Sequence, residues 1–260
     1  MSVISLINLK GGVGKTVSSI NIASAFAKCG KKVLIVDTDS QGNIAKSLGM
    51  NPNDMNNTMV NLISEAIDDE VTEERVLECV RKAGDLDIIP SNLLLSKLEY
   101  KFMNADSREF VLKSIISKVE TNYDYIIIDC PPSLGLMVKN ALTASTYVLI
   151  PVEAHYLSFD SLMDMLDTIG MVRKKLNSNL QIAGIFLTMY QSRTLMGQGV
   201  RSKVQEIYGD TIKVFNDCVP FSIKASEQTL AGKSLVEIAP NHPVSIAYMN
   251  IAKELMQNEN

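Results

Sequence analysis

The stretch Lys10-Gly11-Gly12-Val13-Gly14-Lys15-Thr16 determines how the rest of the chain is interpreted. It follows an apolar run at residues 3–9, which predicts a buried strand, and it precedes a predicted helix at 17–29. Glycines allow the backbone to curl, so that its N–H groups point inward at an anion. The positive end of the following helix adds to that attraction. The context therefore predicts a loop that binds phosphate groups.

Two lysines and a threonine give this loop its chemistry. Lys15 is placed to reach the β- and γ-phosphates of a nucleotide, and the Thr16 hydroxyl is placed to bind Mg²⁺. The common G-x-x-x-x-G-K-[ST] pattern does not quite match, because its first glycine would fall on Leu9. Lys10 would repel Lys15 unless negative charge lay between them, and a nucleotide supplies that charge. Lys10 is also a candidate to point across a dimer interface at a partner's nucleotide.

Carboxylates stand where two further strands are predicted to end. The strand at 32–37 ends in Asp37, with Asp39 two residues later, and the strand at 125–129 ends in Asp129. Ligands of open α/β sheets bind at the carboxyl ends of the strands, and we expect these two strands to be neighbours. Asp39 is assigned to the attacking water and to the magnesium shell. Asp37 and Asp129 are assigned to the magnesium ion, together with the loop threonine.

Helix and strand patterns alternate along most of the chain. Apolar residues three and four apart predict helices, and short runs that are apolar on both faces predict parallel strands. The alternation indicates an α/β fold with one doubly wound, mostly parallel sheet, helices on both faces and a single domain over residues 1–260. The other predicted helices are 92–103, 108–119, 138–144, 159–176, 200–208 and 244–256, and the other predicted strands are 86–90, 147–152, 182–187 and 213–219.

Composition and charge are those of a globular protein that does not bind nucleic acid through its overall charge. The chain has 260 residues and a formal net charge of −4, so that any basic site must be local. A cleavable basic leader and an apolar run long enough to cross a bilayer are not visible, which favours the cytoplasm. Basic residues do outnumber acidic ones between residues 171 and 235: Arg173, Lys174, Lys175, Arg193, Arg201, Lys203, Lys213, Lys224 and Lys233 against Glu206, Asp210, Asp217 and Glu227.

These motifs together resemble the ParA family of partition ATPases, within the deviant Walker A group of P-loop NTPases that also includes MinD and the nitrogenase iron protein. The residues that carry the resemblance are 10–16, 36–43, 127–132, 187–194 and 219–232, which extend over nearly the whole chain. The resemblance implies an MgATP hydrolase that forms a homodimer in its ATP state and binds non-specific double-stranded DNA. It implies plasmid or chromosome partition with a ParB-like partner, association with the nucleoid and no membrane binding.

The resemblance also implies roles for individual residues. Lys10, Lys15 and Asp39 form the catalytic set, in which Lys10 contacts nucleotide across the dimer and Asp39 is required for hydrolysis. Arg193 and Lys224 match the positions that bind DNA. The nucleotide-binding residues are Lys10, Gly11, Gly12, Val13, Gly14, Lys15, Thr16, Val17 and Pro220.

The sequence departs from the family pattern at three of these positions. Phe221 stands where the family usually has arginine, and Val17 replaces a threonine near the phosphates. Lys224 replaces an arginine, which keeps the charge and loses the fork geometry. The chain begins at the phosphate loop, so the helix-turn-helix extension of longer ParA proteins is not expected.

Two other functions within the same group are weighed against partition. A MinD-like membrane-associated positioning ATPase needs a basic amphipathic helix at its C-terminus, whereas residues 251–260 are acidic and rich in amides. A redox reductase or iron–sulfur carrier needs cysteines at its dimer axis, for which Cys79 and Cys130 are the central candidates.

Overall fold

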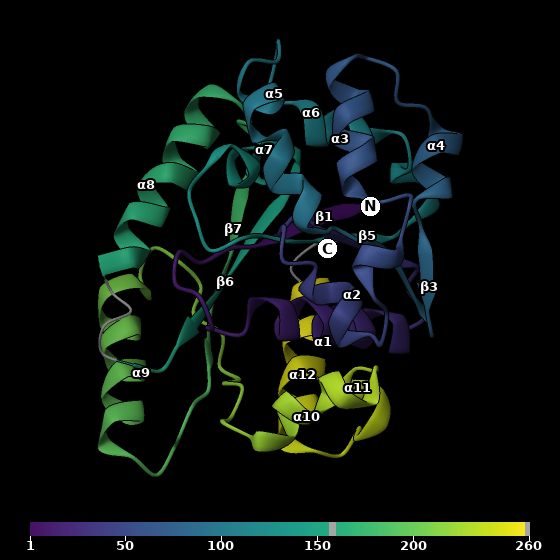
Figure 1. Cartoon of the computed structure of the whole chain (residues 1–260). Coiled ribbons are helices and arrows are strands. Elements are labelled where there is room, and N and C mark those ends of the chain that lie inside the picture. Colours follow the sequence, from purple (N-terminus) through teal and green to yellow (C-terminus); the bar gives the residue numbers. More distant parts are fainter. Residues whose placement is uncertain (156–159, 258–260) are drawn as a thin grey trace.

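The computed structural model describes residues 1–155 and 160–257 (Figure 1). Within them, seven strands form one sheet in the spatial order β3-β4-β2-β5-β1-β6-β7. The β3–β4 pair is antiparallel and the other neighbouring pairs are parallel. The strands are β1 (Ser2–Leu6), β2 (Val33–Asp37), β3 (Arg81–Ala83), β4 (Leu86–Ile89), β5 (Tyr125–Asp129), β6 (Tyr147–Glu153) and β7 (Gln181–Thr188).

Helices cover both faces of this sheet (Figure 1). They are α1 (Lys15–Lys28), α2 (Asn43–Ser47), α3 (Met59–Ile67), α4 (Glu73–Glu78), α5 (Glu99–Met103), α6 (Val111–Ser117), α7 (Leu136–Ala144), α8 (Asp160–Lys175), α9 (Leu195–Tyr208), α10 (Ile223–Ala231), α11 (Leu235–Ile238) and α12 (Pro243–Gln257). Short 3₁₀ turns lie at η1 (Pro52–Asp54), η2 (Leu93–Leu98) and η3 (Glu120–Asn122). Helices α3, α6, α7, α8 and α9 pack on one face, and α1, α2, α11 and α12 pack on the other. The predicted doubly wound α/β fold is confirmed.

Strand β5 shows why the central sequence must be apolar at every position. Ile126 and Ile128 contact the layer that contains α6 and α7, whereas Tyr125 and Ile127 contact the layer that contains α1 and α12. Successive side chains of a strand point to opposite faces, so a strand covered on both sides alternates between two cores. The predicted bounds of β5 are confirmed, and β5 pairs with β2 as expected.

Residues 213–219 do not form the predicted strand. They meet β7 at separate points, through an isolated bridge between Ile185 and Val214 and a backbone hydrogen bond from Val219 N to Leu187 O of 2.8 Å. Gly184 explains the irregular edge, because a Cβ there would lie 2.7 Å from the Phe215 ring. The strand yields at this point to the close approach of an aromatic side chain.

One helix prediction also needs correction. Residues 92–103 form η2 followed by α5 rather than one continuous helix. The predicted helix at 159–176 corresponds to α8, and its first predicted residue, Phe159, lies outside the described residues. Within the part of the chain that the structure describes, no helix combines the length and the apolarity needed to cross a membrane.

Candidate nucleotide and metal site

The loop between β1 and α1 has the backbone of an anion-binding turn. Gly12 and Gly14 have φ values of 79° and 86°, in the left-handed region that residues with side chains rarely adopt. Gly14 is also the N-cap of α1, and this helix end receives no side-chain cap. The first N–H groups of α1 are therefore available to an anion at the loop.

The Lys15 side chain lies inside this loop. Its Nζ donates hydrogen bonds to the carbonyl oxygens of Asn8 (2.9 Å) and Lys10 (3.0 Å). Burial lowers the pKa of the Lys15 ammonium group, and the nearby carboxylate of Asp129 opposes that shift. The loop backbone thus holds a buried cation between its own carbonyls and the acidic edge of the sheet.

Asp129 receives two hydrogen bonds from the first turns of α1. Thr16 Oγ1 donates to Oδ2 and Ser19 Oγ donates to Oδ1, and each hydrogen bond is 2.8 Å long. The two hydroxyls are three residues apart on a helix, so they face the same strand end. Burial raises the pKa of Asp129 to about 6, although these two hydrogen bonds act in the opposite direction.

Asp37 lies beside Asp129 at the end of the neighbouring strand, where the two residues are register partners. It is fully buried and accepts backbone hydrogen bonds from Asp39 N (3.0 Å) and Ile44 N (3.2 Å). Burial, followed by the charge of Asp129, raises the pKa of Asp37 well above its ordinary value. Two buried carboxylates side by side are unfavourable unless a cation lies near them.

The donors at this edge fit a magnesium ion that shares its coordination with phosphate. Among the described residues, no group of three or more His, Cys, Asp or Glu side chains is arranged to hold a metal on its own. The Thr16 hydroxyl stands beside the two buried carboxylates through its bond to Asp129. Mg²⁺ prefers oxygen donors, keeps several waters and commonly binds through one or two carboxylates plus substrate phosphates.

Asp39 stands nearer to solvent than Asp37. Its side chain is half-buried, and its Oδ1 accepts a hydrogen bond of 2.9 Å from Gln41 N. It lies in the segment between β2 and α2, close enough to Lys15 for its charge to act on that ammonium group. A carboxylate at the open side of the loop is suited to orient a water molecule.

Lys10 does not extend into solvent but forms an ion pair with Glu153 of the same chain. Its backbone N donates to Asn8 Oδ1 (2.9 Å), and Asn8 Nδ2 donates to Pro151 O (2.7 Å). The end of β6 therefore holds the loop at two places. Asn8 and Glu153 are not predictable from the sequence, because nothing local shows that β6 ends beside the loop.

The remaining loop residues divide into a buried wall and an open side. Val13 is buried, and its carbonyl oxygen accepts a hydrogen bond of 2.8 Å from Thr188 Oγ1 at the end of β7. Gly11 and Gly12 are exposed, and a Cβ at either position would meet open space. Val17 is half-buried and packs against the core on the α12 side of the sheet. The loop is therefore open on the side of its first two glycines.

The two candidate DNA-binding residues lie on segments that run side by side. Tyr190 forms an isolated bridge with Pro220, supported by hydrogen bonds from Tyr190 N to Val219 O (2.9 Å) and from Phe221 N to Tyr190 O (3.0 Å). Arg193 and Lys224 follow these paired positions, and both are exposed. The backbone thus brings together the segments that carry Pro220, Arg193 and Lys224.

Two other lysines of the basic region are paired within the chain. Lys213 Nζ lies 2.8 Å from Glu254 Oε1, and Lys233 Nζ lies 2.8 Å from Glu237 Oε1. Arg193 and Lys224 take part in no salt bridge among the described residues. The basic region is therefore smaller in the fold than the sequence indicates.

Comparison with known proteins agrees with this geometry. The family described as AAA domain matches residues 1–182. The chain is 38% identical to the sporulation initiation inhibitor protein Soj of Bacillus subtilis, with 98% of each chain covered. It is 32% identical to the chromosome partitioning protein ParA of Caulobacter vibrioides, with 100% of this chain and 95% of that protein covered.

A solved structure shares the fold over nearly its full length. It is the cobyrinic acid a,c-diamide synthase of Mycobacterium smegmatis with bound ATP analogue and magnesium, with a TM-score of 0.85 and 28% identity. The two structures overlap over 100% of this chain and 96% of that one. The fold, the loop between β1 and α1 and the extent of these matches show that the chain belongs to the ParA/Soj family of partition ATPases.

Proposed function

We propose that the chain hydrolyses MgATP, forms a homodimer in its ATP state and binds non-specific double-stranded DNA in that state. With a ParB-like partner it would drive partition of a plasmid or chromosome and would associate with the nucleoid. The observation that carries the proposal is the buried pair Asp37 and Asp129, of which Asp129 is hydrogen-bonded to the start of α1 beside Lys15. Among its relatives, one ParA is named a chromosome partitioning protein and one Soj is named a chromosome-partitioning ATPase. A structural neighbour binds an ATP analogue and magnesium.

The loop residues have distinct roles in binding the triphosphate. The N–H groups of residues 11–16 would bind phosphate oxygens, and Lys15 would exchange its two carbonyl partners for phosphate oxygens. Mg²⁺, when bound, would neutralise charge on the β- and γ-phosphates. Thr16 would hold the ion with its oxygen while it donates its proton to Asp129, as it does in the structure. Pro220 and Val17 would line the remainder of the nucleotide site.

Asp39 is proposed to orient the attacking water. It is the least buried of the three aspartates, so a water molecule can reach it without loss of the buried pair. Lys10 would contact the nucleotide of a second subunit, which requires its side chain to leave Glu153. Lys10, Lys15 and Asp39 thereby form the proposed catalytic set.

The DNA-binding proposal rests on Arg193 and Lys224. Both are exposed on adjacent segments, and a two-fold dimer would present four such side chains to one duplex. A point charge is sufficient for a phosphate contact, so lysine at position 224 serves that role. Binding of this kind carries no base specificity.

The enzymatic part is tested by release of phosphate from ATP. We expect Lys15→Ala to lose nucleotide binding and Asp39→Ala to keep it while losing roughly 10²-fold in turnover, the usual contribution of general acid–base catalysis. Lys113→Ala is the control, because Lys113 is exposed on α6, across the sheet from α1. Equal turnover by Asp39→Ala and the wild type would remove Asp39 from the mechanism.

A further inference from the structure

The ion pair between Lys10 and Glu153 joins the phosphate loop to the end of β6. The side chains of the pair are 35% and 25% exposed, so the contact is neither deeply buried nor freely solvated. Lys10 belongs to the loop that would bind phosphate, and Glu153 is the last residue of its strand. A carboxylate thus lies at a loop whose ligand is expected to be an anion.

The backbone fixes both partners of this pair. On one side, the Asn8 side chain ties Lys10 N to the carbonyl of Pro151, two residues before Glu153. On the other side, Ala154 N donates a hydrogen bond of 3.0 Å to Thr188 O at the end of β7. Because neither backbone is free to drift, formation of the pair costs side-chain entropy but little additional backbone entropy.

The charges at the loop give the pair a consequence for ligand binding. Lys15 donates to the carbonyl of Lys10, so two cationic side chains extend from one short turn. Glu153 offsets the charge of Lys10, and the same carboxylate would repel an incoming polyphosphate and compete with it for Lys10. A triphosphate carries more negative charge than a diphosphate and competes more strongly for the lysine.

The Glu153 side of the pair borders a cavity. Glu153 lines a cavity of about 360 Å³ together with residues of the β7–α9 segment and Phe221. Met189, at the start of that segment, has a φ of 52°, and Tyr190 pairs with Pro220. The carboxylate therefore lies between the phosphate loop and the segments that carry Arg193 and Lys224.

We propose that Glu153 is a positioning residue that holds Lys10 within its own subunit until a nucleoside triphosphate competes for the lysine. This inference rests on the proposed function, because release of Lys10 matters only if the lysine then contacts nucleotide. Glu153 sets the ATP concentration at which Lys10 is released, and it favours release by ATP over release by ADP because ATP carries more negative charge.

The test measures affinity for MgATP and MgADP by titration calorimetry in four proteins: wild type, Glu153→Gln, Lys10→Gln and the double variant. We expect Glu153→Gln to bind MgATP about two- to fivefold more tightly, the range typical of a partly exposed ion pair, with a smaller gain for MgADP. In the Lys10→Gln background the gain should be smaller, because only the direct repulsion between Glu153 and the phosphates is then removed. Glu237→Gln, which removes the ion pair with Lys233 elsewhere, should leave both affinities unchanged.

A second readout is the ATP concentration at half-maximal dimer, measured by light scattering with Asp39→Ala to prevent turnover. Glu153→Gln should lower that concentration by a similar factor. Unchanged or weaker MgATP binding by Glu153→Gln, or an equal gain without Lys10, would overturn the inference. If Asp39→Ala binds MgATP and never dimerises, the proposed function fails. A Lys10-dependent gain in affinity would then mean that Glu153 keeps Lys10 from the nucleotide of its own subunit, and the absence of such a gain would overturn the inference.

Discussion

The Thr16 hydroxyl has two tasks that a single atom can perform together. It donates a hydrogen bond of 2.8 Å to Asp129 Oδ2, and its oxygen lone pairs stay available to a cation. The bond fixes the rotamer of Thr16 and satisfies one oxygen of a carboxylate that is 1% exposed. The position therefore requires a hydroxyl and not merely a small side chain.

A first prediction follows for substitutions at Thr16. Thr16→Ala removes both the proposed magnesium ligand and a hydrogen bond to a buried carboxylate, whose loss costs about 1–3 kcal/mol. We expect Thr16→Ala to bind nucleotide more weakly and independently of magnesium, and to lose turnover. Thr16→Ser keeps the magnesium ligand and the hydrogen bond, so it should keep magnesium-dependent binding and turnover. Nucleotide affinity measured with and without Mg²⁺ checks this. A magnesium-dependent gain in affinity that persists in Thr16→Ala would contradict it.

A second prediction concerns the thiol of Cys79. Burial raises the pKa of Cys79 to about 11, and the side chain is fully buried. The reactive form is the thiolate, so at pH 8 only about one thiol in a thousand is ionised, before access is considered. We expect alkylation of the native protein, followed by mass spectrometry, to modify half-buried Cys29 well before Cys79. Equal alkylation rates of Cys29 and Cys79 would show that Cys79 is not buried in the native protein.

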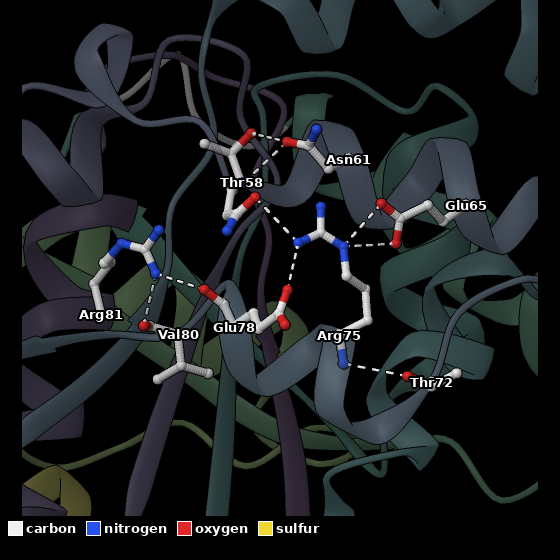
Figure 2. Close-up of polar contacts among 9 residues, drawn as sticks. Thr58, Asn61, Glu65, Thr72, Arg75, Glu78, Val80 and Arg81 are labelled. Atoms are coloured by element: carbon white, nitrogen blue, oxygen red, sulfur yellow. Dashed lines mark hydrogen bonds and ion pairs between the residues drawn. The ribbon is translucent and has the colours of Figure 1, made fainter.

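At the scale of elements, one arginine joins α3 to α4 (Figure 2). Arg75 Nε lies 2.9 Å and 3.0 Å from the two carboxylate oxygens of Glu65, and its Nη1 donates to Asn57 Oδ1 (3.1 Å) and Glu78 Oε2 (2.9 Å). Arg81, by contrast, donates to carbonyls next to it in the chain (Figure 2). Arg75 therefore connects two helices, whereas Arg81 fastens one strand end.

The third prediction compares these two arginines. Arg75→Ala should lower the free energy of unfolding by about 1–2 kcal/mol, because it leaves a half-buried Glu65 without its partner. It should also speed alkylation of Cys79, which caps α4, because the loosened helix exposes the thiol by more than the loss of the Arg75 charge, which lowers the Cys79 pKa, slows the reaction. Arg81→Ala is the matched control and should change both quantities less. The two variants are compared by urea unfolding and by the rate of Cys79 alkylation. Similar effects of both would show that Arg75 does not stabilise the contact between α3 and α4.

Gly232 closes α10 against the loop that follows α2. Its φ is 63°, and a Cβ there would lie 3.2 Å from Gly49 Cα. Gly30 ends α1 with a φ of 78° and has open space where its Cβ would be. The fourth prediction is that Gly30→Ala costs only left-handed strain, about 1–2 kcal/mol, and that Gly232→Ala costs more. Equal losses of unfolding free energy for the two variants, measured by urea unfolding, would mean that the contact between Gly232 and Gly49 does not contribute to stability.

The sequence was most informative where a residue's role depends on its own neighbours. The loop at 10–16, the buried strand β5 and the adjacent aspartates could be predicted, because glycine patterning and apolar runs are local signals. Asn8 and Glu153 could not, because each acts on a partner 143 residues away. The false strand at 213–219 has the same origin: its apolar alternation does not show that Phe215 packs against Gly184.

At the scale of the whole molecule, buried polar contacts connect the nucleotide and DNA-binding candidates. Asn21 of α1 donates from Nδ2 to Gln228 Oε1 of α10 over 2.9 Å, and both side chains are fully buried. The α1 helix begins at the phosphate loop, and α10 carries Lys224. The helix that begins at the phosphate loop and the helix that carries Lys224 are therefore joined by a buried contact on one face of the sheet (Figure 1).

ATP is proposed to control DNA binding through this fold. The most direct test of this control is retention on non-specific duplex DNA without nucleotide, with ADP and with ATP, for wild type, Arg193→Ala and the control Lys113→Ala at two salt concentrations. We predict that ATP alone promotes retention, that Arg193→Ala abolishes it and that Lys113→Ala does not, with a salt dependence that reflects phosphate contacts. Equal retention in all three nucleotide states, in a protein that still hydrolyses ATP, would show that ATP does not control DNA binding.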